Sequence, residues 1–173
     1  MRLKGFIDVD HTNYKKLSMF LALPDCTFKC CNECGVNVCQ NSTLAKDKEV
    51  FMTKEEICES YLANPLTEAI VLGGLEPFDS DLDIISFIDC LRRQYECKDD
   101  VVIYTGYTED ELLTGWRDTD KLKNETRADM FKMLLKQKNI VIKYGRFVPD
   151  DEGRFDEVLG VKLASSNQYA KAY

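Results

Sequence analysis

Ala69-Ile-Val-Leu-Gly-Gly-Leu-Glu-Pro77 is the segment with the clearest indication of the fold class. It begins with a short, continuous apolar run and then reaches two glycines, as a buried strand of a parallel sheet does. Similar runs occur at Leu17–Leu23, Val101–Tyr104 and Ile140–Ile142. A strand that is apolar on both faces needs cover on both faces, so these runs predict an α/β architecture.

Helical segments are expected between these strands. Thr53 and Glu56 have the spacing of a capping box, which opens a helix. Ser80 is expected to cap the next helix, in which apolar residues recur at helical spacing. A polar helix-forming stretch over about 108–137 contains a break around Thr114–Gly115. Alternating strands and helices predict a mostly parallel sheet with right-handed crossovers.

The chain has 173 residues, which is room for one domain. A closed eight-fold barrel typically needs about 250 residues, so we expect an open, partial (β/α) barrel spanning residues 1–173. No repeat, low-complexity tract or linker divides it. The segment from Phe147 onward, about 147–173, is expected to be irregular because it is acidic and then polar.

Charge and hydropathy exclude several classes of protein. The formal net charge is −7, which argues against a general nucleic-acid binder. No apolar run approaches the roughly 20 residues that a membrane span needs. Charged residues interrupt the N-terminal MRLKGFIDVD too early for a signal peptide. We therefore expect a soluble, cytoplasmic protein without a membrane or nucleic-acid partner.

Cysteines are numerous and unevenly placed. Three of the 8 lie in separate segments, and Cys58 and Cys90 have the helical context of buried apolar residues. The others crowd into one segment: Cys26, Cys30, Cys31, Cys34 and Cys39. In a reducing compartment such a group indicates metal binding or redox chemistry rather than disulfides.

Three chemistries remain open for this group. Zinc needs four ligands, usually as two separated pairs. A redox couple would use Cys31-Asn-Glu-Cys34 and leave the other thiols without a role. An iron–sulfur cluster accepts thiolates from a compact loop and fits the density of cysteines best.

The distinctive segments all follow predicted strands. The cysteine group comes after the first, Gly73-Gly74 after the second and Thr105-Gly106-Tyr107 after the third. The carboxyl ends of parallel strands meet at one edge of a sheet, where ligands bind. The sequence therefore predicts one site assembled from successive strand ends.

Five motifs occur in order along the chain: Cys26-Thr-Phe-Lys-Cys30, Gly73-Gly74-Leu75-Glu76-Pro77, Tyr104-Thr105-Gly106-Tyr107-Thr-Glu-Asp-Glu-Leu112, Gly145-Arg146-Phe147-Val148 and Ser165-Ser166-Asn167-Gln168. They resemble, in turn, the first two cysteines of a CxxxCxxC loop, a GGEP element, WTGYxxDEL, DGKF and a terminal GSSNQ. This set is similar to that of the radical SAM proteins that activate anaerobic (class III) ribonucleoside-triphosphate reductase. The resemblance covers nearly the whole chain.

The resemblance implies a mechanism and a fold of the radical SAM type. Three thiolates hold a [4Fe–4S] cluster, and S-adenosylmethionine (SAM) binds its open iron through the amino and carboxylate groups. Reductive cleavage gives a 5′-deoxyadenosyl radical, which makes a glycyl radical on the reductase. The implied partners are that reductase subunit and a low-potential electron donor such as flavodoxin or ferredoxin. No catalytic residue beyond the cluster and SAM site is implied.

The resemblance assigns Cys26 and Cys30 as cluster ligands, but the motif's third cysteine would fall on Glu33. We expect Cys39 as the third ligand, because the Gln40-Asn41-Ser42-Thr43 that follows it resembles the family's downstream residues. Cys34 is the alternative, since it keeps the loop compact.

The resemblance also implies SAM-binding residues. Gly73 and Gly74 let the strand end approach a ligand closely, and Glu76 adds a charge-assisted partner for the methionine ammonium. Leu75 is an additional residue relative to GGEP. Further contacts to the nucleoside or to the partner are expected from two of the motifs, through Tyr104, Thr105, Gly106, Tyr107, Ser165, Ser166, Asn167 and Gln168. Tyr144 stands where the relatives carry Asp, so a role of that Asp does not transfer.

Two alternatives stay open. One is an activase of another glycyl radical enzyme, or a radical SAM protein with a small substrate. The other is a non-catalytic zinc-binding interaction module that uses Cys26, Cys30, Cys34 and Cys39. The zinc module leaves the Gly73–Pro77 element without a role.

Overall fold

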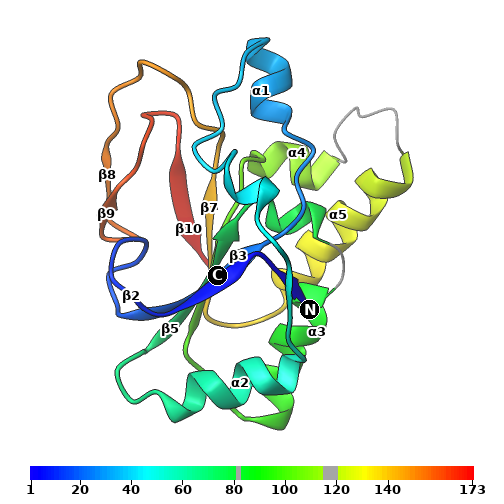
Figure 1. Ribbon diagram of the computed structural model, residues 1–173, viewed down its shortest axis with the longest axis vertical. Coiled ribbons are helices and arrows are strands. Elements are labelled where there is room, and N and C mark those ends of the chain that lie inside the picture. Colours follow the sequence, from blue (N-terminus) through cyan, green and yellow to red (C-terminus); the bar gives the residue numbers. More distant parts are fainter. Residues whose placement is uncertain (81–82, 115–120) are drawn as a thin grey trace.

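The computed structural model describes residues 1–80, 83–114 and 121–173. Its centre is a six-stranded sheet in the order β10-β7-β6-β5-β3-β2. The inner strands β3, β5, β6 and β7 run parallel, and the edge strands are antiparallel to their neighbours (Figure 1). The strands are β2 (Gly5–Asp10), β3 (Ser18–Leu23), β5 (Ala69–Gly74), β6 (Asp100–Tyr104), β7 (Ile140–Tyr144) and β10 (Tyr169–Ala172). Within the described residues the sheet is open and mostly parallel, not closed into a barrel.

All four parallel strands confirm the predicted apolar runs, whereas the edge strands were not predicted. The tail differs from the expected irregular segment. Its last residues form β10, which pairs with β7 from Tyr169 opposite Tyr144 to Ala172 opposite Val141. Before it, β8 (Phe155–Asp156) and β9 (Val161–Lys162) make a small antiparallel pair. Such short strands depend on a partner for their form, and so their local sequence is a weak guide.

The helices between the strands follow the predicted pattern with some differences. They are α2 (Lys54–Ala63), α3 (Asp83–Asp89), α4 (Glu109–Thr114) and α5 (Lys121–Leu134). The capping box is confirmed, since Thr53 Oγ1 accepts from the Glu56 amide and the Glu56 carboxylate accepts from the Thr53 amide. Ser80 ends the 3-10 helix η2 (Pro77–Asp79), and its hydroxyl donates to the Glu76 carbonyl. Residues 81–82, which separate it from α3, lie outside the described residues, so the capping of α3 by Ser80 stays a prediction. The expected break is consistent with the end of α4 at Thr114, and Gly115 lies outside the described residues.

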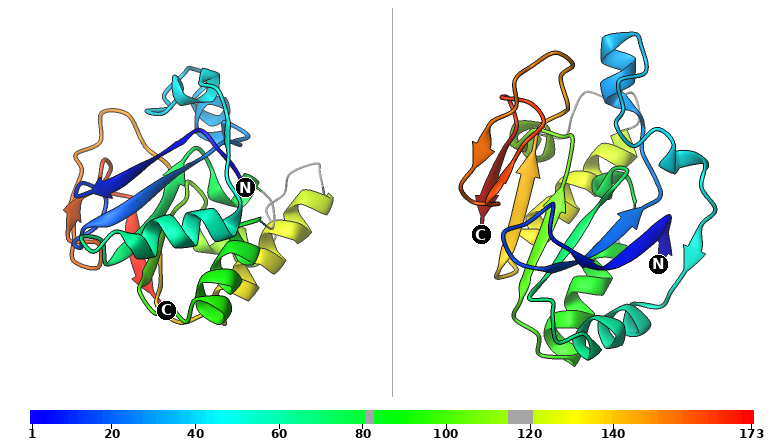
Figure 2. Two further views of the ribbon diagram at one scale, coloured as in Figure 1. Left: turned by 60° about the horizontal axis from the view of Figure 1, so that its bottom comes forward. Right: turned by 60° about the vertical axis from the view of Figure 1, so that its left-hand side comes forward.

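The sheet has an apolar core on each face. On one face α2, α3 and α5 pack against side chains such as Leu72 and Ile142 (Figures 1 and 2). Cys58, Cys90 and Cys97 are buried in this core, in agreement with the structural role expected for Cys58 and Cys90. The π-helical turn η3 (Cys90–Gln94) continues α3. On the other face a smaller apolar cluster forms between the sheet and the residues that cover it. The sheet contributes Ala69, Val71, Val102, Val141 and Ala170, and the covering residues are Tyr14, Leu159 and Leu163.

The first part of the segment between β3 and α2 lies beyond the end of the sheet toward which the parallel strands point, and the rest runs back alongside the sheet to α2 (Figure 2, right). The segment contains α1 (Lys29–Cys34), which has no buried residue, and η1 (Leu44–Lys46). It returns through β4 (Val50–Phe51), which pairs with β1 (Arg2–Leu3). Among the described residues, none of the helices has the length and apolarity to cross a membrane.

Candidate functional site

A pocket lies where the carboxyl ends of β3, β5, β6 and β7 meet. Most residues singled out by the sequence line it: Cys26, Cys30, Cys39, Gly73, Gly74, Glu76, Tyr104, Thr105 and Gly106. The expected assembly of one site from successive strand ends is therefore present. Cys34, Ser166 and Asn167 are not among the lining residues.

The cysteine loop, residues 24–49 between β3 and β4, brings three thiols to this pocket from different positions. Cys26 follows β3 directly, and its sulfur accepts a hydrogen bond from the Phe28 amide at 3.2 Å. Cys30 lies on α1, which Gly35 ends with a left-handed φ of 69°. Cys39 lies beyond that helix and reaches the same pocket. Cys34, in contrast, is exposed at the last turn of α1.

Burial opposes ionisation of the two matched thiols. It raises the pKa of Cys26 to about 12. Burial also raises the pKa of Cys30 to about 11, and the nearby Cys31 and Cys39 thiols add to the shift. Thiolates are the metal-binding form, so binding a positively charged group here would release protons from these cysteines.

Cys31 lies close to the site without reaching the pocket lining. Its sulfur is 4.0 Å from that of Cys30 and donates to Asn37 Oδ1 at 3.4 Å. In the described part of the chain, no three Cys, His, Asp or Glu side chains gather closely enough to hold a single metal ion. The four thiols of the zinc alternative are thus not arranged as a closed tetrahedral site.

Asp79 holds the first part of the cysteine loop to the sheet. Its carboxylate accepts from the Thr27 amide at 2.7 Å and from the Tyr107 hydroxyl at 3.0 Å. It also forms a buried ion pair with Arg127 of α5, with 2.6 Å between Nη2 and Oδ1. This one side chain connects the loop, the β6 end and a covering helix.

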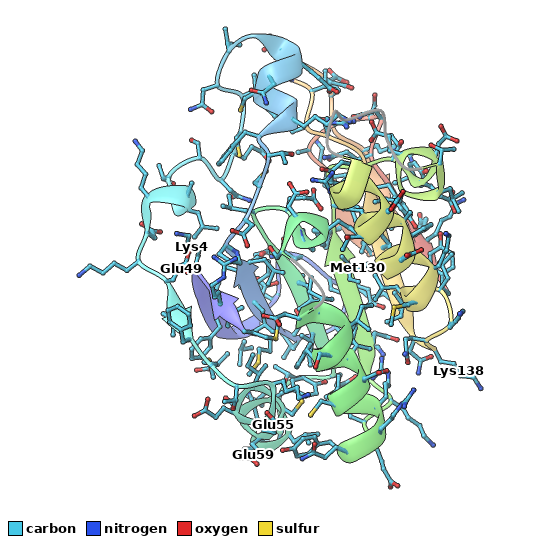
Figure 3. The ribbon with its side chains drawn as sticks, turned by 90° about the vertical axis from the view of Figure 1, so that its right-hand side faces the viewer. Lys4, Glu49, Glu55, Glu59, Met130 and Lys138 are labelled. Carbon is cyan, nitrogen blue, oxygen red and sulfur yellow. The ribbon has the colours of Figure 1, made fainter. Side chains whose placement is uncertain are left out.

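Lys4 holds the returning part of the loop. Its ammonium donates to the Asp47 carbonyl at 2.7 Å and to the Ala45 carbonyl at 3.2 Å. It also lies beside Glu49, 3.8 Å from Oε1 (Figure 3). Both ends of the cysteine loop are therefore fixed by charged side chains of the scaffold.

Two cations that line the pocket, Lys29 and Arg146, share one carboxylate partner. Glu111 of α4 accepts from Lys29 at 2.8 Å and from Arg146 at 2.7 Å. Burial opposes ionisation of Glu111, but these hydrogen bonds outweigh it and hold its pKa below the ordinary value. The cations of Lys29 and Arg146 lie 5.5 and 5.9 Å from the centroid of the Tyr107 ring.

The two glycines at the end of β5 are required by the neighbouring strand. A Cβ on Gly74 would lie 2.8 Å from Ala22 Cα, and its φ is +83°. A Cβ on Gly73 would meet the Phe20 ring at 2.9 Å. The Gly74 carbonyl accepts from Asn41 Nδ2 at 2.5 Å, which connects the residues just after Cys39 to the strand end.

Glu76 is buried and tied to the next strand end. Its Oε1 accepts from Thr105 Oγ1 at 2.7 Å and from the Phe78 amide at 3.1 Å, and its Oε2 accepts from the Gly106 amide at 2.8 Å. Burial raises the pKa of Glu76, and these hydrogen bonds oppose the shift. Each carboxylate oxygen can accept about two hydrogen bonds, so Oε2 keeps room for one more donor.

Tyr104 and the terminal polar turn have clear structural contacts. The Tyr104 hydroxyl donates to the Asn13 carbonyl at 2.5 Å, while its side chain lines the pocket. Ser166 donates to Asp151, and Asn167 donates to the Arg146 carbonyl at 3.0 Å. Gln168, buried in the same turn, does line the pocket.

Sequence reasoning missed Lys143 and Arg146 as pocket residues, whereas Gln168, expected from its motif to contact the nucleoside or the partner, does line the pocket. Arg146 lies in a recognised motif, but the motif predicts no role for it. Lys143 had a local signal, because a lysine stands within the apolar strand Ile140–Tyr144. Burial lowers the pKa of Lys143 to about 8, while the nearby Glu76 opposes the shift.

Residues 15–167 match a family model described as a 4Fe-4S single cluster domain. The chain belongs to this family. Among curated proteins and solved structures, none matches the chain. Membership in the 4Fe-4S single cluster domain family supports an iron–sulfur cofactor. Of the three chemistries considered for the cysteine group, the iron–sulfur cluster is thus the one supported.

The residues of the pocket fit such a cluster. Three thiols line one pocket, and they come from a loop that scaffold side chains hold at both ends. Thiolate is the usual ligand of a [4Fe–4S] cluster. The thiols lie too far apart to bind one metal ion together, but a cluster does not require this, because each of its cysteine ligands binds a different iron.

Proposed function

We propose that this 4Fe-4S single cluster domain is a radical SAM activase that generates a glycyl radical on an anaerobic ribonucleotide reductase. The observation that carries the proposal is the pocket itself. It combines Cys26, Cys30 and Cys39 with the Gly73–Gly74 strand end and with polar groups of the β6 end. Three cysteine ligands leave one iron of a four-iron cluster without a protein ligand.

When bound, a [4Fe–4S] cluster held by these cysteines would supply electron transfer for the reductive cleavage of SAM, and the resulting 5′-deoxyadenosyl radical would take a hydrogen atom from a glycine of the partner. The protein would bind the cluster and SAM, orient them relative to each other and shield them from water. Cys26, Cys30 and Cys39 hold the cluster. Glu76 offers its remaining acceptor position on Oε2 to the methionine ammonium.

Other residues of the proposed site shape the ligand's surroundings. The Tyr104 and Tyr107 rings offer apolar surface for adenine or ribose, and Asn41 holds the Gly74 carbonyl. The proposed substrate is macromolecular: the glycine that loses its hydrogen atom lies on a loop of the partner that would reach the pocket. The proposed setting is the cytoplasm, with flavodoxin or ferredoxin as electron donor and the reductase as partner.

Electron paramagnetic resonance on anaerobically reconstituted, reduced protein tests the proposal. We expect a reduced four-iron signal that changes shape when SAM is added, because SAM occupies the open iron. A four-iron signal that SAM leaves unchanged would contradict the radical SAM site. Stoichiometric zinc in the purified protein, without an iron signal after reconstitution, would favour the interaction module.

A positive result leaves the partner to be identified. Mixing the reduced protein, SAM and an anaerobic ribonucleotide reductase should produce a glycyl radical doublet. If SAM is cleaved but no doublet forms with the reductase, the partner is another glycyl radical enzyme or a small substrate.

A further inference from the structure

Lys143 is a buried cation in the pocket wall. It lies on β7, in register with Tyr104 of β6 and Ala170 of β10. Only 7% of Lys143 is exposed. Its neighbours Ile142 and Tyr144 face the helix-side core, and Val141 faces the other side of the sheet. Strand alternation therefore places the ammonium on the face where the pocket opens.

The chain offers Lys143 little compensation for its charge. Its ammonium donates to the Gly145 carbonyl at 2.8 Å and lies 5.9 Å from the centroid of the Tyr104 ring. Among the ion pairs of the described residues, none includes Lys143. Two other cations of the pocket, Lys29 and Arg146, do contact Glu111.

Glu76 does not serve as that partner. It is the carboxylate whose charge acts on Lys143, but its oxygens accept from Thr105, Phe78 and Gly106. A buried ammonium without a carboxylate is costly, and a lysine with several protons to donate is suited to an anion from outside the chain. The pocket thus has a positively charged position that the protein leaves for a ligand.

We propose that Lys143 binds a carboxylate group of the ligand in this pocket. A singly charged anion matches one ammonium, whereas a dianionic phosphate would also face the acidic Glu76 on the same wall. The carboxylate has two possible sources. It belongs either to the amino-acid part of SAM, which rests on the proposed function, or to a separate carboxylate substrate.

The first arm of the test measures affinity by equilibrium dialysis on anaerobically reconstituted protein. Lys143→Met should weaken SAM binding by about 10- to 100-fold, the range for a lost charged hydrogen bond. It should change the affinity for decarboxylated SAM by less than about threefold. Lys162→Met, the same change at an exposed lysine of β9, should leave both affinities unchanged.

The second arm uses acetate as the probe and acetamide as its neutral isostere. At high concentration acetate should raise the melting temperature of the reconstituted wild type, while acetamide should not. The shift should be absent in Lys143→Met. If saturating SAM removes the acetate shift, the cofactor supplies the carboxylate; if the shift persists, the carboxylate belongs to a separate substrate.

Lys143→Met should fold, because methionine fills a similar volume and the buried charge is removed. Lys143→Gln provides a second uncharged variant if it does not. Equal SAM affinity and equal acetate shift in wild type and variants would overturn the proposal. Failure of wild type to bind SAM would overturn the proposed function alone, and the acetate arm would still test Lys143.

Discussion

Cys39 and Cys34 lie close in the chain but face different surroundings. Cys39 lines the pocket with Cys26 and Cys30, whereas Cys34 is exposed. We therefore expect Cys39→Ala to lose most of the iron and sulfide bound after anaerobic reconstitution. Cys34→Ala should keep the wild-type content, and it is the matched control. Retention of the cluster by the Cys39 variant and its loss in the Cys34 variant would reverse this ligand assignment.

Asp10 has a depressed pKa with a structural consequence. Burial raises the pKa, but hydrogen bonds from the side chains and amides of Thr12 and Asn13 outweigh it and lower it below the ordinary value. A carboxylate with a lowered folded-state pKa stabilises the fold above its unfolded pKa, near 4, and loses that effect as pH falls through the folded pKa. Asp10 should therefore stabilise the protein at neutral pH and not in acid.

Asp10→Asn should lower the free energy of unfolding at pH 7 by about 1–2 kcal/mol. The difference from wild type should shrink as the pH is lowered below about 4. Urea unfolding at several pH values measures both quantities. Asp8→Asn on the same strand, where the side chain is exposed, is the control. A deficit that stays constant down to acid pH would show that the charge of Asp10 is not the cause.

For individual residues, the sequence predicted membership of the site better than it predicted the role of each side chain. Cys26, Cys30 and Glu76 could be recognised from motifs, and all three line the pocket. Motifs say which residues recur but not what they contact. Glu76 thus proved to be held by three donors of its own chain, and Lys143 was visible only as a lysine in an apolar strand.

Among the secondary-structure elements, η2 connects the cysteine loop to α5 through the side chain of Asp79. The ion pair between Asp79 and Arg127 is almost fully buried, at 4% and 6% side-chain exposure. Removing one partner of a buried pair leaves the other charge uncompensated. Asp79→Asn should therefore cost about 3 kcal/mol of stability and loosen the start of the cysteine loop.

Hydrogen exchange followed by mass spectrometry separates these effects. Asp79→Asn should speed exchange over residues 26–34 in addition to lowering global stability, because the Thr27 amide donates to Asp79. Asp83→Asn, an exposed carboxylate at the start of α3, should change neither. A global loss of stability with unchanged exchange in the loop would mean that Asp79 supports the core and not the loop.

The sequence predicted elements well where local signals are strong. The buried strands have continuous apolar runs, and the capping box at Thr53 has a specific residue spacing. The edge strands β2 and β10 lack such signals, since hydrogen bonds to β3 and β7 determine their form. The end of the helix at Gln94 is likewise a π-helical turn, which helical periodicity does not reveal.

In the molecule as a whole, the cysteine loop contributes no residue to the hydrophobic core: among the described residues, neither apolar cluster includes a residue between 24 and 49. In that segment only Pro24 is buried. The sheet and its helices therefore have a hydrophobic core that does not depend on the loop. This differs from small metal domains, which fold only when the metal is bound.

Removing the cluster should consequently leave the fold in place. We expect metal-free and reconstituted protein to have the same far-ultraviolet circular dichroism and the same cooperative unfolding, with a higher melting temperature for the reconstituted form. Limited proteolysis should cut the metal-free protein within residues 24–49, because this segment has few buried contacts of its own, and the cluster should protect it. Loss of helical signal on metal removal would instead mean that the cluster organises the core. Cys34→Ala, which keeps the proposed ligands, should gain the same protection as wild type, and its failure to do so would link Cys34 to the cluster after all.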